Sequence, residues 1–240
     1  MKTVALIPIR AGSKGIPGKN MKDMCGKPLA EWVVDAALKA ESIDEVWVST
    51  DSEEYWEHFD NHAIEYRVKD GAVVGGMSDA LLRPDWLATD TATSDDVLRH
   101  FCWARCDPED HVVMLQATSP LTTSDDIDGA VCVLTNIVGL TGCAIRDRTV
   151  VSVVEMPTRM YWTDCHPNYN PFNRPMRDRV PETYMENGAI YCSGVRRILS
   201  GGARITDYAN PYIMPPETAT EIDTPEDWDI VEKLLEARLS

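Results

Sequence analysis

The sequence lacks an uninterrupted apolar run of the roughly 20 residues that a membrane helix requires. Its first residues, MKTVALIPIR, reach Pro8 and Arg10 too early for the apolar core of a secretory signal. These two absences predict a cytoplasmic protein. A chain of 240 residues can bury one substantial core, so we expect a single domain over residues 1–240.

The sequence also lacks an excess of positive charge. Lys and Arg number 23 against 39 Asp and Glu, which gives a formal net charge of -16. Surfaces that bind nucleic acid depend on clustered cations, so this balance argues against such a partner. One short segment is the exception, because Arg10, Lys14, Lys19, Lys22 and Lys27 lie close together in the sequence. This concentration predicts a local site for a small anionic substrate.

Cysteine patterns typical of zinc sites are missing. Among the seven cysteines there is no CxxC pair, and none has the histidine spacing of a zinc site. Most lie in apolar stretches, as Cys132 does in GAVCVLTNIV, which predicts buried, reduced thiols. The sequence has no internal repeat or low-complexity segment.

Strand and helix patterns alternate along the chain. Continuous apolar runs predict strands over 3–9, 45–51, 111–116, 141–155 and 184–193, with strand or loop at 204–215. Helical spacing and capping residues predict helices over 28–42, 53–59, 93–106, 124–138 and 224–239. A short strand at 64–68 precedes a stretch, 70–91, that is predicted as loop. This alternation is typical of an α/β fold with a mostly parallel sheet.

The segment RAGSKGIPGKN directly follows the first predicted strand. Ligands of open α/β sheets bind at the carboxyl ends of the strands, so this loop is placed where a substrate should bind. Gly12 and Gly15 allow backbone N–H groups to approach oxyanions, and Ser13 adds a hydroxyl donor. The loop matches neither GxxxxGK[ST] nor GxGxxG. A solvated turn with incidental lysines is the alternative interpretation.

Several sequence blocks together resemble one enzyme family. IPIRAGSKGIPGKN followed by GKPL is similar to the signature of the acylneuraminate cytidylyltransferases, the CMP-sialic acid synthetases. Further blocks match in order over nearly the whole chain: STDSEEY, LLRPDWLATDTATSDDV, HVVMLQATSP, NPFNRPMRD, YMENGAIY and EIDTPEDW. The resemblance implies a three-layer α/β fold of the nucleotide-diphospho-sugar transferase type, Rossmann-like, with a mixed, mostly parallel sheet. It also implies transfer of CMP from CTP to the anomeric oxygen of a nonulosonic (sialic-type) acid, with release of pyrophosphate.

The resemblance also implies roles for individual residues. Arg10, Lys19 and Asp223 are expected to take part in catalysis. The expected nucleotide contacts are Arg10, Ala11, Gly12, Ser13, Lys19 and Asn20 for the phosphates, and Arg83, Ala92 and Ser94 for cytosine and ribose. The expected contacts of the acceptor sugar are Gln116, Thr118, Ser119, Asn187, Tyr191, Arg159 and Arg177. From the residues alone, Arg83 would be interpreted as a surface ion-pair residue and Tyr191 as a core residue.

Glu221 and Asp223 in EIDT are the expected ligands of Mg²⁺. Two residues apart on an extended segment, their side chains project to one face, and Mg²⁺ prefers a few carboxylates together with substrate phosphates. Similar enzymes more often have Asp at the first position, so Asp223 is the principal ligand and Glu221 is expected to bind directly or through water. Without the resemblance, a helix-capping pair is the alternative.

The segment 147–186 is expected to form an arm that mediates homodimerisation. The stretch from 156 to 182 is rich in Pro, Asn, Arg and aromatic residues and has no regular period, which is typical of a functional or interface segment. In similar enzymes this region reaches the neighbouring active site, where Arg159 and Arg177 would meet the sugar carboxylate. An exposed basic loop is the alternative.

Two positions differ from the usual family pattern. Thr122 and Met185 stand where arginines are common, which leaves the identity of the sugar open. Two other functions therefore stay as alternatives: a CMP-KDO synthetase, and a nucleotide- or sugar-binding regulator without activity.

Overall fold

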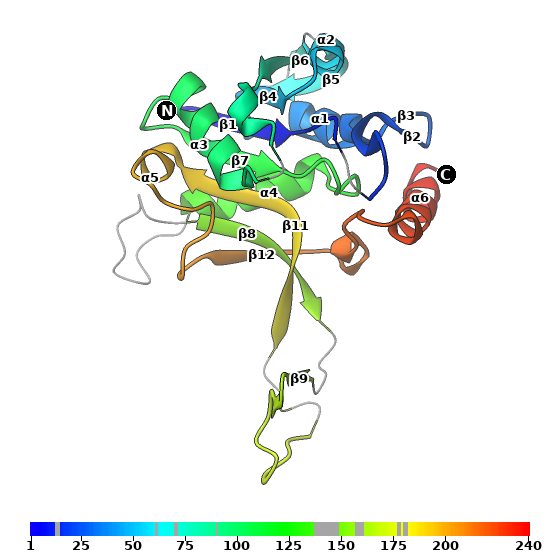
Figure 1. Ribbon diagram of the computed structural model, residues 1–240, viewed down its shortest axis with the longest axis vertical. Helices are drawn as coiled ribbons and strands as arrows, with labels where there is room; N and C mark the ends of the chain where they lie inside the picture. The colour runs from blue at the N-terminus through cyan, green and yellow to red at the C-terminus, as the bar shows by residue number, and fades with distance from the viewer. Residues whose placement is uncertain are drawn as a thin grey trace.

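One large sheet forms the centre of the molecule (Figure 1). The computed structural model describes residues 1–12, 15–60, 62–69, 72–89, 91–136, 149–156, 161–176, 179 and 182–240, and of residues 63–77 the backbone alone. The eight strands lie in the order β12-β8-β11-β7-β1-β4-β6-β5. They are β1 (Thr3–Pro8), β4 (Glu45–Thr50), β5 (Ala63–Lys69), β6 (Ala72–Leu82), β7 (His111–Leu115), β8 (Thr149–Met156), β11 (Thr183–Gly194) and β12 (Asn210–Met214).

The sheet is mixed and mostly parallel, as the sequence predicts. Strands β6, β4, β1 and β7 run parallel to one another, and β12 runs parallel to β8. Strand β11 is antiparallel to both β7 and β8, and β5 is antiparallel to β6. The carboxyl ends of β6, β4, β1 and β7 therefore meet at one edge of the sheet.

Helices cover both faces of the sheet. Helices α1 (Leu29–Lys39), α2 (Glu53–Phe59) and α4 (Ser124–Asn136) pack on one face, and α3 (Ser94–Arg105) and α5 (Val195–Leu199) pack on the other. These three layers confirm the predicted fold class. The last helix, α6 (Pro225–Leu239), packs with the segments that precede α1 rather than on the sheet, as Figure 1 shows.

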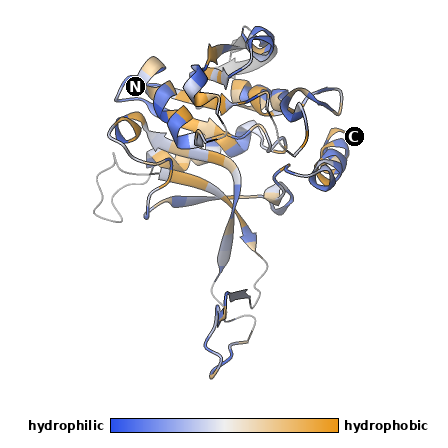
Figure 2. Ribbon diagram, in the orientation of Figure 1, coloured by the Kyte–Doolittle hydropathy of each residue, from blue (hydrophilic) through white to orange (hydrophobic). Residues whose placement is uncertain are grey.

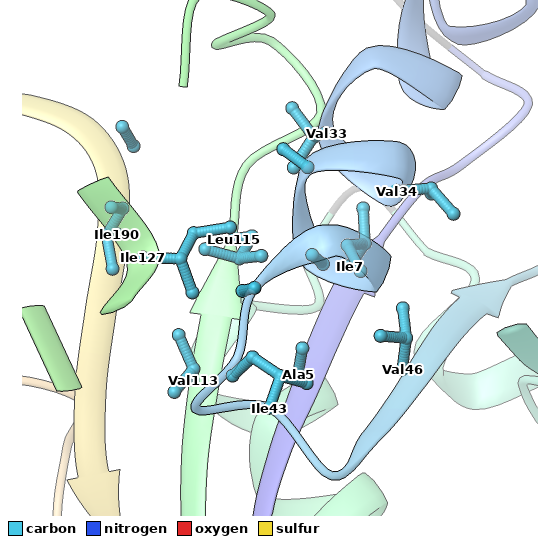
Figure 3. Close-up of a cluster of buried hydrophobic side chains, with 14 of the residues drawn as sticks. Ala5, Ile7, Val33, Val34, Ile43, Val46, Val113, Leu115, Ile127 and Ile190 are labelled. Atoms are coloured by element: carbon cyan, nitrogen blue, oxygen red, sulfur yellow. The ribbon is translucent and has the colours of Figure 1, made fainter. Parts of the chain in front are cut away.

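Apolar side chains fill the space between the layers. Figure 3 shows Val33 and Val34 of α1 next to Ile7 of β1, with Leu115 of β7 and Ile127 of α4 beside them. All five side chains are buried. In Figure 2 hydrophobic residues concentrate in the strands and on the helix sides that face them. Burial of apolar surface stabilises such a core by roughly 25 cal/mol per Å².

The sequence prediction was wrong for residues 72–82. They were predicted as loop because small residues obscure the pattern, but they form β6, which pairs in parallel with β4 from Val46↔Ser78 to Thr50↔Leu82. Tertiary pairing outweighs the weak strand preference of Gly and Ala here. The prediction also missed α5, a helix of five residues.

Strands β8 and β11 extend beyond the sheet as a two-stranded arm (Figure 1). Their pairing continues from Glu186↔Val153 to Thr183↔Met156, and the small hairpin of β9 (Trp162–Thr163) and β10 (His166–Pro167) lies at the tip. Large apolar side chains are exposed on this arm, and Phe172 is 98% exposed. None of the helices in the described ranges combines the length and apolarity needed to cross a membrane.

A charged cluster joins α1 to the start of β5. The Asp35 carboxylate accepts hydrogen bonds from His62 Nε2 at 2.9 Å and from Lys27 Nζ at 2.5 Å. Burial alone would raise the pKa of Asp35, but the two hydrogen bonds outweigh it and lower this pKa. The hydrogen bond to Asp35 raises the pKa of His62 above 6.5.

His62→Gln should therefore destabilise the protein in a pH-dependent way. Because the pKa of His62 is raised in the folded state, protonated His62 contributes its full stabilisation of the fold below about pH 6.5. This stabilisation is lost as the pH rises through the folded-state pKa. We expect the variant to lose about 0.5–1.5 kcal/mol at pH 5.5 and much less at pH 9, measured by urea unfolding. His166→Gln, at an exposed histidine, is the control. An equal loss of stability at both pH values would contradict the interaction of protonated His62 with Asp35.

Candidate functional site

A cavity of about 390 Å³ opens at the carboxyl ends of β6, β4, β1 and β7. This volume suits a small organic ligand. Its position is the one that the sequence predicts for a substrate. The lining residues come from four regions: the loop after β1 (Pro8, Arg10, Gly15, Lys19, Asn20), the ends of β4 and β6 with the segment that leads into α3 (Asp51, Arg83, Leu87, Ala88, Thr89, Ala92, Thr93, Ser94, Val97), the end of β7 (Gln116, Ala117, Thr118), and the segment before α6 (Glu221, Asp223).

The loop after β1 turns back on itself before α1. Gly18 has a positive φ of 62°, which favours glycine, and it begins the short 3-10 helix η1 (Lys19–Met21). The buried Asn20 closes the loop, because its Nδ2 donates to the Arg10 carbonyl at 2.9 Å. Lys19 and Asn20 are thereby fixed at the cavity wall. Ser13 lies outside the described residues, and Ala11 and Gly12 are exposed beside the cavity.

Gly15 brings this loop into direct contact with the segment before α6. A Cβ atom at position 15 would lie 2.2 Å from the carbonyl oxygen of Asp223, which is far inside van der Waals contact. Only glycine permits this approach. Two segments about 200 residues apart in the sequence therefore form one wall of the cavity.

Lys19 links the same two segments electrostatically. Its Nζ donates to the carbonyl of Ile222 and lies 3.3 Å from Asp223 Oδ1. Ile222 is fully buried, while Glu221 and Asp223 on either side of it line the cavity. The alternation of an extended segment thus places both carboxylates on the cavity side, as the sequence predicts.

The two carboxylates fit a magnesium ion that also binds substrate phosphates. The Asp223 side chain is 74% exposed, so a ligand in the cavity can reach it. Glu221 accepts a hydrogen bond from Thr118 Oγ1 at 3.2 Å. No group of three or more metal-binding side chains occurs among the described residues. Mg²⁺ commonly binds through one or two carboxylates, with waters and phosphates as its remaining ligands, so this donor set is sufficient.

Arg83 is buried at the base of the cavity, not on the surface. Its guanidinium donates to Ser49 Oγ at 2.9 Å, to the Ser49 carbonyl at 2.6 Å and to the Ile9 carbonyl at 3.0 Å. Burial lowers the pKa of Arg83 to about 10, against the opposing effect of Asp51, and Arg83 remains protonated at neutral pH. The interpretation of Arg83 as a surface ion-pair residue was therefore wrong. Arg83 ties the ends of β1 and β4 together beneath the cavity.

The predicted base and sugar contacts divide into two groups. Ala92 and Ser94 line the cavity next to the start of α3, and Gln116 and Thr118 line it at the end of β7. Their contacts with the base, the ribose and the sugar stay predictions. Gly188, with φ +70°, lies directly against Glu221, because a Cβ there would be 2.9 Å from Glu221 Oε2.

Ser119, Asn187 and Tyr191 are not brought to the cavity. Ser119 is buried, and its hydroxyl has no hydrogen-bond partner among the described residues. The Asn187 amide is occupied by Ser152 and Thr218 behind the sheet, and Tyr191 packs in the core on the α3 side. The contact of these three residues with a sugar stays a prediction. Arg159 and Arg177 lie outside the described residues.

Two members of the predicted cationic cluster point elsewhere. Lys22 Nζ lies 4.1 Å above the Trp228 ring, and Lys27 pairs with Asp35 and Trp32. Of the cluster's described cations, Arg10 and Lys19 line the cavity. The sequence analysis also missed Asp51, which follows β4 directly and could have been found as a polar residue at the carboxyl end of a buried strand.

Gly15→Ala should destabilise the protein and disturb the cavity wall, because the new Cβ would overlap the Asp223 carbonyl. We expect a loss of about 1–3 kcal/mol in the free energy of unfolding, measured by urea titration. Gly12→Ala is the matched control, since a Cβ at position 12 meets nothing within 4 Å. Equal stability of the two variants would show that the loop and Asp223 are not in contact.

Known proteins that are similar to this chain point to one enzyme family. The family model described as cytidylyltransferase matches residues 4–155. The chain is 32% identical to CMP-N,N'-diacetyllegionaminic acid synthase of Legionella pneumophila, over 98% of this chain and 97% of that protein. It is 30% identical to N-acylneuraminate cytidylyltransferase of Escherichia coli and 34% identical to N-acylneuraminate cytidylyltransferase B of Danio rerio, over 95% of this chain in both cases. It spans about half the length of these last two, 51% and 50%.

Solved structures support the fold. CMP:2-keto-3-deoxy-manno-octonic acid synthetase complexed with CTP superposes with a TM-score of 0.67 at 17% identity, covering 99% of this chain and 100% of that one. The 4-diphosphocytidyl-2C-methyl-D-erythritol synthase of Anaerococcus prevotii gives 0.63 at 13% identity, covering 98% and 99%. The matching family model and the relatives at 30–34% identity over 95–98% of the chain establish that this protein belongs to the cytidylyltransferase family.

Proposed function

We propose that this protein transfers CMP from CTP to the anomeric oxygen of a nonulosonic acid and releases pyrophosphate. The observation that carries this proposal is the cavity wall in which Lys19, at the end of the glycine-rich loop, lies next to the carboxylate of Asp223. A cationic loop beside an exposed carboxylate suits a triphosphate that arrives with a divalent cation. The names of the relatives at 30–34% identity support the same substrates.

The reaction would displace pyrophosphate from the α-phosphorus of CTP. The anomeric oxygen forms a bond to phosphorus, its proton passes to solvent or a base, and the bond between the α-phosphorus and the bridging oxygen breaks. Negative charge then builds on the departing pyrophosphate. Arg10 and Lys19, which line the cavity, would stabilise that charge together with backbone N–H groups of the loop.

Asp223 and Glu221 would hold Mg²⁺ beside this loop. The ion would supply positive charge next to the phosphates and so offset repulsion during the displacement. Lys19 would then exchange its contact with Asp223 for contact with phosphate. The cytosine end would lie toward Arg83, Ala92 and Ser94.

Gln116 and Thr118 would contact the acceptor sugar at the end of β7. The 2-keto-3-deoxy-manno-octonic acid synthetase shares the fold at 17% identity, whereas enzymes named for nine-carbon acids share 30–34% of the sequence. This difference favours a sialic-type acid, and the relative that matches over both full lengths is named for N,N'-diacetyllegionaminic acid.

A homodimer and a cytoplasmic location complete the proposal. Exposed side chains on the arm include Trp162, Phe172 and Met176, and apolar surface of this kind is typical of a protein interface. A neighbouring copy would cover the arm and receive Arg159 and Arg177 near its own sugar site.

Pyrophosphate release tests the function directly. With CTP and Mg²⁺, we expect turnover with N-acetylneuraminate, KDN or legionaminate and at least tenfold lower kcat/KM with KDO. Preference for KDO would make the protein a CMP-KDO synthetase. CTP binding without turnover on any of these acids or pseudaminate would favour an inactive regulator.

Asp223→Asn should lower kcat by about 10²–10³-fold while the protein stays folded, because it removes the charge of the principal metal ligand and keeps the shape of the side chain. Steady-state kinetics over a range of Mg²⁺ concentrations measures this loss, and circular dichroism checks the fold. Asp229→Asn, at an exposed position on α6, is the control. Near-normal activity of Asp223→Asn at saturating Mg²⁺ would remove Asp223 from the metal site.

A further inference from the structure

Asp51 is a cavity residue to which the proposed reaction assigns no task. It follows the last residue of β4, lines the cavity, and accepts a hydrogen bond from the backbone N–H of Ala11 at 2.9 Å through Oδ1. No second hydrogen bond of this carboxylate is found in the described part of the chain. One carboxylate oxygen therefore remains available on the cavity side.

A carboxylate is an unexpected group in a cavity for a polyanion. Asp223 and Glu221 have a role as metal ligands, but Asp51 belongs to no group of three metal-binding side chains among the described residues. Close to phosphates, its charge would be repulsive. The carboxylate must therefore face a part of the substrate that carries no negative charge.

The neighbours of Asp51 indicate which part this is. On one side it holds Ala11, at the start of the loop that would bind the phosphates. On the other side it interacts electrostatically with Arg83, which lies at the end of the cavity assigned to cytosine. In a nucleotide the ribose joins the phosphates to the base. A position between the loop and Arg83 is consequently the position of the ribose.

We propose that Asp51 recognises the ribose of the nucleotide by accepting a hydrogen bond from a ribose hydroxyl through the oxygen that Ala11 does not use. An ionised carboxylate only accepts hydrogen bonds, so it matches a hydroxyl donor and repels phosphate. Asp51 thereby makes the site selective for ribonucleotides over deoxyribonucleotides. This inference rests on the proposed use of CTP.

The Ala11 bond gives Asp51 its orientation. It fixes one oxygen against the loop, so the other oxygen needs no reorganisation when the nucleotide binds. A hydrogen bond to a charged acceptor is stronger than one to a neutral acceptor, and a site with such an acceptor disfavours an analogue that lacks the hydroxyl. The discrimination should appear mainly in KM, because the ribose takes no part in the bond changes.

The test compares kcat/KM for CTP, 2′-deoxy-CTP and 3′-deoxy-CTP in the full-length enzyme and its variants. The wild-type protein should prefer CTP over one deoxy analogue by roughly 10- to 100-fold. In Asp51→Ala the preference should fall to within about threefold, and in Asp51→Asn, which retains an acceptor for Ala11, it should fall to an intermediate value. The ratio of kcat/KM for CTP to kcat/KM for a deoxy analogue does not respond to a general effect on the loop, because both nucleotides use the same loop.

Asp229→Asn is the matched control and should keep the wild-type preference. An unchanged preference in both Asp51 variants, or no preference in the wild-type protein, would overturn the inference. If Asp51→Ala does not fold, as judged by circular dichroism, Asp51→Asn decides alone. Failure of the proposed function is a different result, because the wild-type protein would then turn over none of the three nucleotides.

Discussion

The site depends on the close contact between the loop after β1 and the segment before α6. Gly15 lies against the carbonyl of Asp223, and Lys19 donates to the carbonyl of the adjacent Ile222. A side chain at position 15 would separate the two segments and widen the cavity. Arg10 and Asp223 come from opposite ends of the sequence, and this contact puts them in one cavity.

A small hydrophobic core holds that contact in place. Ile16 from the loop and Ile222 from the second segment are buried together with Leu121 and with Trp228 of α6. Arg238 of α6 donates to the Leu121 carbonyl at 2.6 Å, which ties the helix to the turn after β7. Helix α6 therefore supports the loop after β1, the segment before α6 and the turn after β7, although it lies beside the sheet and not on it.

Charge in the cavity is balanced before any substrate arrives. Arg10, Lys19 and Arg83 line it together with Asp51, Glu221 and Asp223. Because these charges offset one another, the groups can stay ionised in a partly enclosed cavity, although the whole protein has a net charge of -16. A triphosphate alone would disturb the balance, whereas a triphosphate with a divalent cation would disturb it less. The presence of both cations and carboxylates in the cavity thus favours a metal-bound nucleotide.

The sequence predicts the fold class and most elements, because continuous apolar strands and amphipathic helices leave local patterns. It fails for β6, whose small residues form a strand only through pairing with β4. At the site, Lys19, Gln116, Thr118 and Asp223 line one cavity, and their individual roles stay predictions. Asp51 was missed although it directly follows a buried strand. The burial of Arg83 could not be read from the residues alone, because it comes from partners distant in the sequence, Ser49 and Ile9, which no local pattern reveals.

A crystal structure with CTP and Mn²⁺ would test the central claim most directly. We expect the triphosphate over the loop from Arg10 to Asn20, and anomalous scattering from Mn²⁺ beside the Asp223 carboxylate. A nucleotide bound elsewhere, with this loop and Asp223 still in their present contact, would contradict the account.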